Sequence, residues 1–184
     1  MGLFSLFRKK PSPSELAEDL GPLLVQVAVH ECKSFQQAWD RELDNKTQVA
    51  LFAEFMILLV AVADRLAFDK FGDPVRSEIL NPVVDTARTC FARQKSFGPT
   101  PEKRGLYFDR LFDRRFQMFA SCSTIMGEGL DSVVFTGAQH LAETFLDDLP
   151  DSELPDAVVE TGKVVTKAVV ALMTVPSFKA LSEK

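Results

Sequence analysis

Residues 49–63 have the sequence VALFAEFMILLVAVA, and this run decides the fold. Glu54 is its one charged residue, and Asp64 and Arg65 follow directly after it. A helix that spans a membrane needs about 20 apolar residues, so the run is too short for that role. A helix that is apolar on nearly all sides is buried among other helices. The run therefore predicts a central helix in the core of a helical bundle.

The residues on either side of this run carry the start and stop signals of further helices. Residues 12–15 (SPSE) form a capping box with proline at the first helical position, and Gly72 is a helix terminator. Pro22 and Pro82 are expected to kink or break their helices, because proline removes a backbone hydrogen bond. The predicted helices cover approximately residues 12–43, 46–71, 73–96, 101–127, 131–147 and 154–174.

Apolar residues recur at helical spacing, and no stretch alternates with a period of two between hairpin turns. The valine-rich segment 157–170 is assigned to a helix, with a strand as the alternative. A length of 184 residues suits one domain. We therefore predict an all-α fold, a single-domain antiparallel bundle of about six helices around the central apolar helix. The domain covers residues 12–184, after a flexible apolar and basic segment at residues 1–11.

Charge and cysteine content exclude some classes of partner. The formal net charge is −5, whereas contacts to nucleic-acid phosphates need a surplus of Lys and Arg. No nucleic-acid partner is expected. The three cysteines are odd in number and form no CxxC pair, which argues against a disulfide framework and a zinc site. They indicate a reducing compartment, and we expect a cytoplasmic protein.

The sequence offers few metal-binding side chains at useful spacing. His30, Glu31 and Cys32 are consecutive, and neighbouring residues on a helix point about 100° apart, so they cannot share one ion. The second histidine, His140, is expected on the exposed side of its helix, with Glu143 one turn away. No metal and no cofactor are predicted.

Arg115 is the residue that most strongly indicates a site. Helical spacing places it within an apolar stripe that includes Phe108, Phe112 and Phe119. A buried guanidinium without a partner costs several kcal/mol, so Arg115 must find a carboxylate, a carbonyl or a bound anion.

Glu54 is the natural partner of Arg115, which leaves two interpretations. The two residues form either a structural ion pair or part of an interhelical pocket for an anionic ligand, with Arg115 as the clamp. Tyr107, Asp64 and Arg65 are further candidate lining residues of such a pocket.

The amino-terminal segment also has two interpretations. It is either a frayed or docked terminus, which is the expected case, or a contact with a membrane surface through apolar side chains followed by cations. The candidate contact residues are Leu3, Phe4, Leu6, Phe7, Arg8, Lys9 and Lys10.

No catalytic or nucleotide-binding motif is present: the sequence has no GxSxG, P-loop, GxGxxG or HExxH. No reaction can be assigned, and no catalytic residue is predicted. The first hypothesis is a non-enzymatic interaction or regulatory protein that acts through a protein partner or as a homo-oligomer. The alternatives are a protein that binds a small anionic ligand near Arg115 and Glu54, and a peripheral membrane protein.

Overall fold

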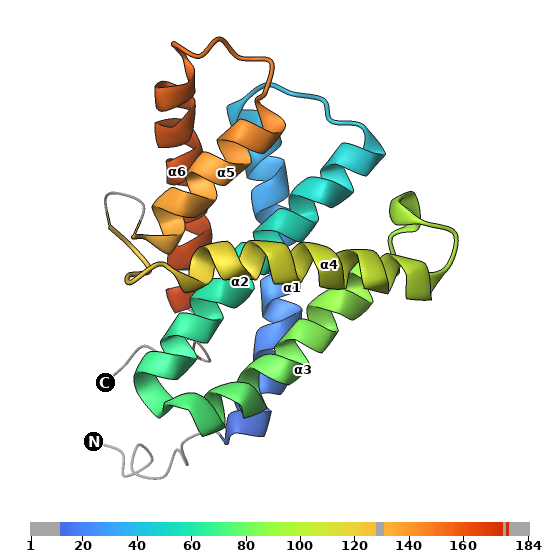
Figure 1. The fold of residues 1–184 in the computed structure, drawn as a ribbon, viewed down its shortest axis with the longest axis vertical. Helices are drawn as coiled ribbons and strands as arrows, with labels where there is room; N and C mark the ends of the chain where they lie inside the picture. The colour runs from blue at the N-terminus through green and yellow to red at the C-terminus, as the bar shows by residue number, and fades with distance from the viewer. Residues whose placement is uncertain (1–11, 128–130, 175, 177–184) are drawn as a thin grey trace, which may run out of the picture.

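The computed structural model describes residues 12–127, 131–174 and 176. In this part of the chain it contains six α-helices and one short 3-10 helix, which confirms the all-α prediction (Figure 1). The elements are α1 (Pro13–Ala38), α2 (Asn45–Phe71), α3 (Asp73–Ala92), η2 (Lys95–Phe97), α4 (Pro101–Ala120), α5 (Val133–Phe145) and α6 (Leu154–Thr174).

The second helix, α2, is the axis of the molecule. Every residue from 51 to 63 is buried, as the apolar run predicted. The helices α1, α3, α4, α5 and α6 all contact α2, and their apolar faces join it in one continuous hydrophobic core. Figure 1 shows α4 lying across α2, whereas α5 and α6 run side by side in opposite directions.

Two internal prolines do not interrupt their helices, although the sequence predicts kinks or breaks there. Pro22 lies within a continuous α1, and Pro82 lies within a continuous α3. The two helices pack closely at this level: a Cβ atom on Gly21 would lie 2.8 Å from Oγ1 of Thr86. That hydroxyl donates a hydrogen bond to the carbonyl of Pro82 at 2.9 Å. Packing between α1 and α3 therefore outweighs the local effect of the prolines.

Three helices end four or more residues earlier than the sequence predicts, and α3 is one of them, since it ends at Ala92 rather than near residue 96. The first helix ends at Ala38, and Asp40 follows it with a φ of 45°. The fourth ends at Ala120, where the hydroxyl of Ser121 donates to the carbonyl of Met118 at 2.8 Å. Serine and threonine side chains that bond to the backbone in this way compete with helix formation.

The connection between α4 and α5 is tied together by its own backbone. The amide of Ser123 donates to the carbonyl of Asp131 at 2.8 Å, and an isolated bridge joins Thr124 to Ser132. Ser132 then caps α5: its hydroxyl accepts from the amide of Phe135 at 3.4 Å and donates to the carbonyl of Ile125 at 3.2 Å. This fully buried serine therefore positions the start of α5.

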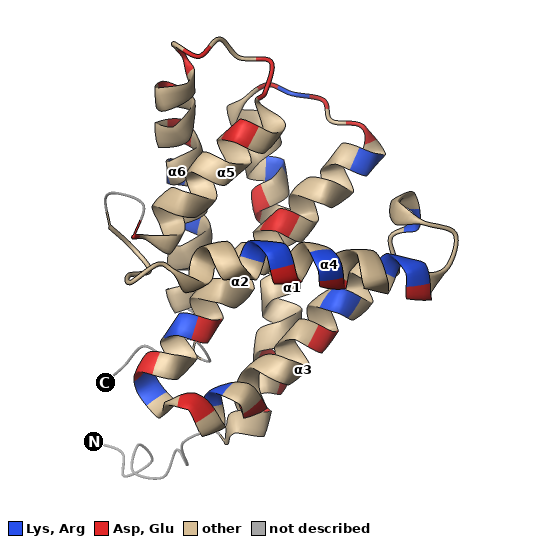
Figure 2. Ribbon diagram, viewed as in Figure 1, with Lys and Arg blue, Asp and Glu red and all other residues tan. Residues whose placement is uncertain are grey.

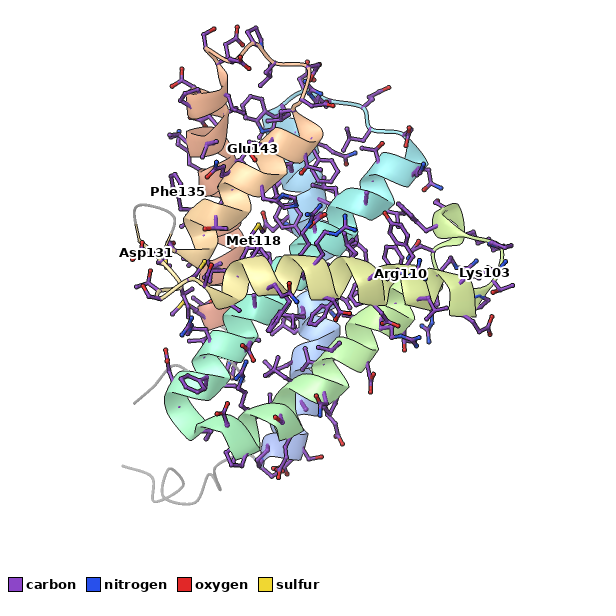
Figure 3. All side chains as sticks on the ribbon, viewed as in Figure 1. Lys103, Arg110, Met118, Asp131, Phe135 and Glu143 are labelled. Atoms are coloured by element: carbon purple, nitrogen blue, oxygen red, sulfur yellow. The ribbon has the colours of Figure 1, made fainter. Side chains whose placement is uncertain are left out.

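Charged residues gather in the connections, at helix ends and along α4 (Figure 2). Lys103 and Arg110 both project from α4 (Figure 3). None of the helices among the described residues has the combination of length and apolar character that a membrane span requires.

Replacing Ser132 with alanine is expected to lower the free energy of unfolding by about 1–2 kcal/mol, because a helix cap and a buried hydrogen bond are lost together. Urea unfolding followed by circular dichroism measures this change. The control is Ser77→Ala, since Ser77 is an exposed serine in the interior of α3. Its effect should stay within about 0.5 kcal/mol. Equal effects of the two substitutions would contradict the role given to Ser132.

Candidate functional site

Glu54, the charged residue in the buried part of α2, lies where α2, α4 and α5 meet. Nε of Arg115 donates to Oε1 of Glu54 at 3.1 Å and to Oε2 at 3.3 Å. The Glu54 side chain is 6% exposed and that of Arg115 is 23% exposed. The ion pair that the sequence predicted is therefore confirmed, and a buried carboxylate is neutralised within the fold.

His140 is the third member of this cluster, and its predicted exposure is wrong. The side chain is 13% exposed, and Nε2 lies 3.1 Å from Oε2 of Glu54, within ion-pair distance but without hydrogen-bond alignment. On the other side of the ring, Nδ1 lies 3.3 Å from Oγ1 of Thr144. The apolar residues of α5 define its main packing face, but they do not reveal that Glu54 of α2 lies beside the polar edge of that face.

The remaining candidates from the sequence do not join this cluster. Tyr107 lies two turns along α4 from Arg115, where its ring packs 4.8 Å from Phe97 and stacks at 6.0 Å on Phe91. Asp64 and Arg65 lie further along α2 and line a separate cavity. The structure therefore keeps Tyr107, and the pair Asp64 and Arg65, apart from the Glu54–Arg115 contact. A ligand-binding role for Arg115 itself stays a prediction.

The proposed membrane contact cannot be placed on the fold. Its residues lie outside the part of the chain that the structure describes: Leu3, Phe4, Leu6, Phe7, Arg8, Lys9 and Lys10.

A groove of about 430 Å³ lies between α1, α2 and α3. Its apolar surface comes from two residues of α2, Val49 and Phe52, which are both 8% exposed, and from Val25, Val29 and Cys32 of α1. A groove of this size and composition is typical of small-molecule sites, which have volumes of roughly 300–1,000 Å³ and mainly apolar walls.

The rim of this groove is polar and carries positive charge. Lys33 of α1 and Arg93 at the end of α3 are its two charged lining residues, and both are exposed. Neither has a carboxylate partner among the described residues. The sequence does not reveal this pair, because the two cations lie 60 positions apart in the chain and share no motif.

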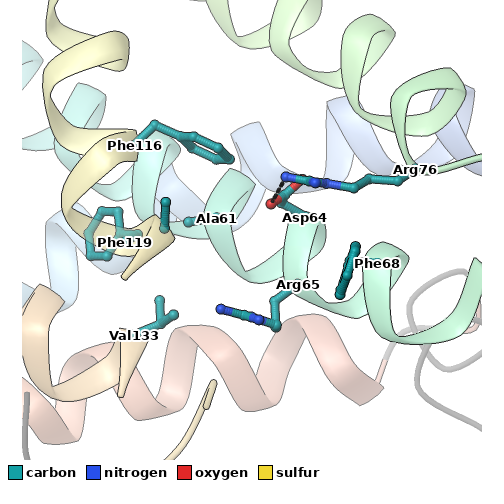
Figure 4. Close-up of a pocket in the computed structure, with 9 residues that line it drawn as sticks. Ala61, Asp64, Arg65, Phe68, Arg76, Phe116, Phe119 and Val133 are labelled. Carbon is teal, nitrogen blue, oxygen red and sulfur yellow. Dashed lines mark hydrogen bonds and ion pairs between the residues drawn. The ribbon is translucent and has the colours of Figure 1, made fainter. Parts of the chain in front are cut away.

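A cavity of about 280 Å³ lies further along α2, between that helix, α4 and the start of α5 (Figure 4). Both Asp64 and Arg65 line it, so these two sequence candidates do reach one cavity. Nε and Nη2 of Arg76 donate to the two oxygens of Asp64 at 2.5 and 2.7 Å. Arg65 instead donates to the carbonyl of Cys122.

Arg104 is a buried charge that the sequence analysis did not single out. Its Nε donates to the carbonyl of Ala92 at 2.6 Å, and its Nη1 donates to the carbonyl of Gly98 at 2.7 Å. These carbonyls end α3 and follow η2, so Arg104 holds the α3–α4 connection in place. Backbone carbonyls give no sequence signal, which explains why this role was missed.

The described residues contain no group of three His, Cys, Asp or Glu side chains arranged to hold a metal ion. Comparisons of the chain with protein-family models, with curated proteins and with solved structures returned no match. A function is therefore argued from the geometry of the sites themselves.

The Glu54–Arg115 pair can be tested with a double-mutant cycle of Glu54→Gln and Arg115→Met. Each single substitution is expected to lower the free energy of unfolding by about 2–3 kcal/mol, because it leaves a mostly buried charge without its partner. The double variant should lose about 1–2 kcal/mol less than the sum of the two.

The control for this cycle is Lys163→Met, which removes an exposed ion pair with Glu160 on α6 and should change stability little. The pairing would be contradicted if the changes in the free energy of unfolding caused by Glu54→Gln and Arg115→Met were strictly additive.

Cys32 in the groove provides a prediction that depends on pH. Burial, and then the charge of Glu31, raise the pKa of its thiol well above the usual range. At about pH 8.5 an unfolded cysteine is half thiolate, so iodoacetamide should modify Cys32 much more slowly in the native protein than in urea. A thiol pKa that is raised by folding also means that stability falls as the pH rises above about 8.5.

Mass spectrometry of the alkylated peptides measures the first effect. Urea unfolding of the wild type and of Cys32→Ala at pH 7 and about pH 9.5 measures the second, and the variant should lose less stability at the higher pH. Equal alkylation rates in the native and unfolded chains would contradict the burial of this thiol.

Proposed function

We propose that this protein is a non-enzymatic binding protein for a medium-chain amphipathic anion, such as a fatty carboxylate, which occupies the groove between α1, α2 and α3. The observation that carries the proposal is the charge of the lining. Within the described part of the chain, Lys33 and Arg93 have no carboxylate partner, and no Asp or Glu is among the residues that line the groove. An anionic head group at the rim compensates this charge, while an apolar chain covers Val49 and Phe52.

The shape of the groove supports a chain rather than a compact ligand. Gln36 and Gln48 line the groove and also line a second depression of about 460 Å³ beside the α1–α2 connection. That depression is lined mainly by charged and amide side chains, so the apolar chain of the ligand follows the groove itself, where burial of each methylene against Val25, Val29, Val49 and Phe52 contributes about 0.8 kcal/mol. The amides of Gln36 and Gln94 provide polar contacts near the cations.

This proposal is compatible with the regulatory protein predicted from the sequence. Three helices line the groove, so occupancy would favour the arrangement of α1, α2 and α3 that binds the ligand and would stabilise it by mass action. A protein partner or a second copy of the chain that contacts these helices would then respond to the ligand. The free thiols of Cys32 and Cys90 support a cytoplasmic setting.

Isothermal titration with three probes that carry a ten-carbon chain tests the proposal: decanoate, decan-1-ol and decyltrimethylammonium. Decanoate is expected to bind most tightly and the cationic probe most weakly, because the probes differ only in their head groups. Lys33→Met and Arg93→Met should each weaken decanoate binding by up to about fivefold, as expected for exposed ion pairs.

The matched control is Arg110→Met, which removes an exposed cation of α4 that does not line the groove. This variant should bind decanoate as the wild type does. The proposal fails if decanoate does not bind or if decan-1-ol binds as tightly as decanoate. It also fails if Lys33→Met, Arg93→Met and Arg110→Met all bind decanoate with the same affinity.

A further inference from the structure

The cavity beside Arg65 is independent of the groove and differs from it in lining and size. Three phenylalanines line it, Phe68 from α2 and Phe116 and Phe119 from α4, and Val133 completes the apolar wall (Figure 4). Phe68 is 42% exposed, and Phe119 is 4% exposed. A volume of about 280 Å³ is near the lower limit for small-molecule sites, so this cavity suits a ligand of about one or two rings.

The charges in this cavity are not equivalent. Asp64 is occupied by Arg76, which binds both carboxylate oxygens and also contacts Asp73 at 3.0 Å. The guanidinium of Arg76 in addition lies 5.5 Å from the ring centroid of Phe68. Arg76 is therefore engaged by the carboxylates of both Asp64 and Asp73 and is not available to a ligand.

Arg65 is the cation that remains available. It donates to the carbonyl of Cys122, and no carboxylate pairs with it among the described residues. A guanidinium has five N–H donors, and a single carbonyl satisfies few of them. The Arg65 side chain extends along the cavity towards Val133 (Figure 4). Its positive charge thus lies within a partly enclosed aromatic site.

We propose that this cavity is a second ligand site, specific for a small aromatic carboxylate. The planar guanidinium of Arg65 matches a carboxylate in a two-bonded geometry. The ring of the ligand packs against Phe68, Phe116 and Phe119, since aromatic rings favour stacked and edge-to-face contacts. A free phosphate is disfavoured because the apolar wall has no polar groups to replace the hydrogen bonds that the ion makes with water.

Titration with benzoate and 1-naphthoate, followed by NMR chemical shifts of the full chain, tests this site. Both carboxylates are expected to bind, with shifts confined to residues of α2, α4, the start of α5 and the region of α3 around Arg76, which also lines the cavity. Benzyl alcohol has nearly the same size without the charge, and its binding should be at least about tenfold weaker.

Two variants test the site in different ways. Arg65→Met should weaken naphthoate binding by more than about tenfold, and Arg65→Lys should restore part of it, because lysine keeps the charge without the planar fork. Ala120→Phe places a ring in the cavity at an exposed position and leaves Arg65 intact. It should also abolish binding, so the test does not depend on the folding of an Arg65 variant.

The groove variants separate this proposal from the proposed function. Lys33→Met and Arg93→Met should leave naphthoate binding unchanged, while Ala120→Phe should leave decanoate binding unchanged. The proposal is overturned if neither aromatic carboxylate binds, if Ala120→Phe binds naphthoate as the wild type does, or if the groove variants remove naphthoate binding.

Discussion

The structure depends on how the buried stretch of α2, residues 51–63, accommodates the carboxylate of Glu54. A stretch of helix that is enclosed on all sides has no direction in which a charge can reach water, so the groups that pair with Glu54 must come from other helices. Arg115 of α4 and His140 of α5 lie 3.1 Å from the two oxygens of Glu54. The Arg115 contact ties α4 to α2 where the two helices cross, whereas the apolar residues of α5 define which of its sides faces the core.

The burial of residues 51–63 also separates the groove from the aromatic cavity. The middle of α2 is packed against protein, and these two open spaces lie towards its two ends. The groove is lined by Val49 and Phe52 near the start of the helix, and the aromatic cavity is lined by Arg65 and Phe68 near its end. The central cluster thus separates two sites that have different cations and walls of different chemistry.

Much of the fold could be predicted from the sequence, because the strongest signals are local. The apolar run of α2 and the capping box before α1 each specify an element without reference to the rest of the chain. Glu54 and Arg115 could be paired because each is a charge in an apolar stripe. His140 could not be added to them, since it lies outside the apolar stripe of its own helix and so gives no sign of a buried partner. The continuity of α1 through Pro22 was not predicted either, because the close packing of Gly21 against Thr86 of α3 is a tertiary contact. The groove depends on tertiary placement of Lys33 and Arg93, which no spacing along the chain reveals.

Native-state hydrogen exchange of the α2 amides tests the central claim most directly. If α2 is the enclosed axis of the fold, the amides of residues 51–63 should exchange only through global unfolding. Their opening free energies should then equal the free energy of unfolding measured with urea. Amides near Glu54 that open at a much lower free energy, while α1 and α3 stay protected, would contradict an α2 enclosed on all sides.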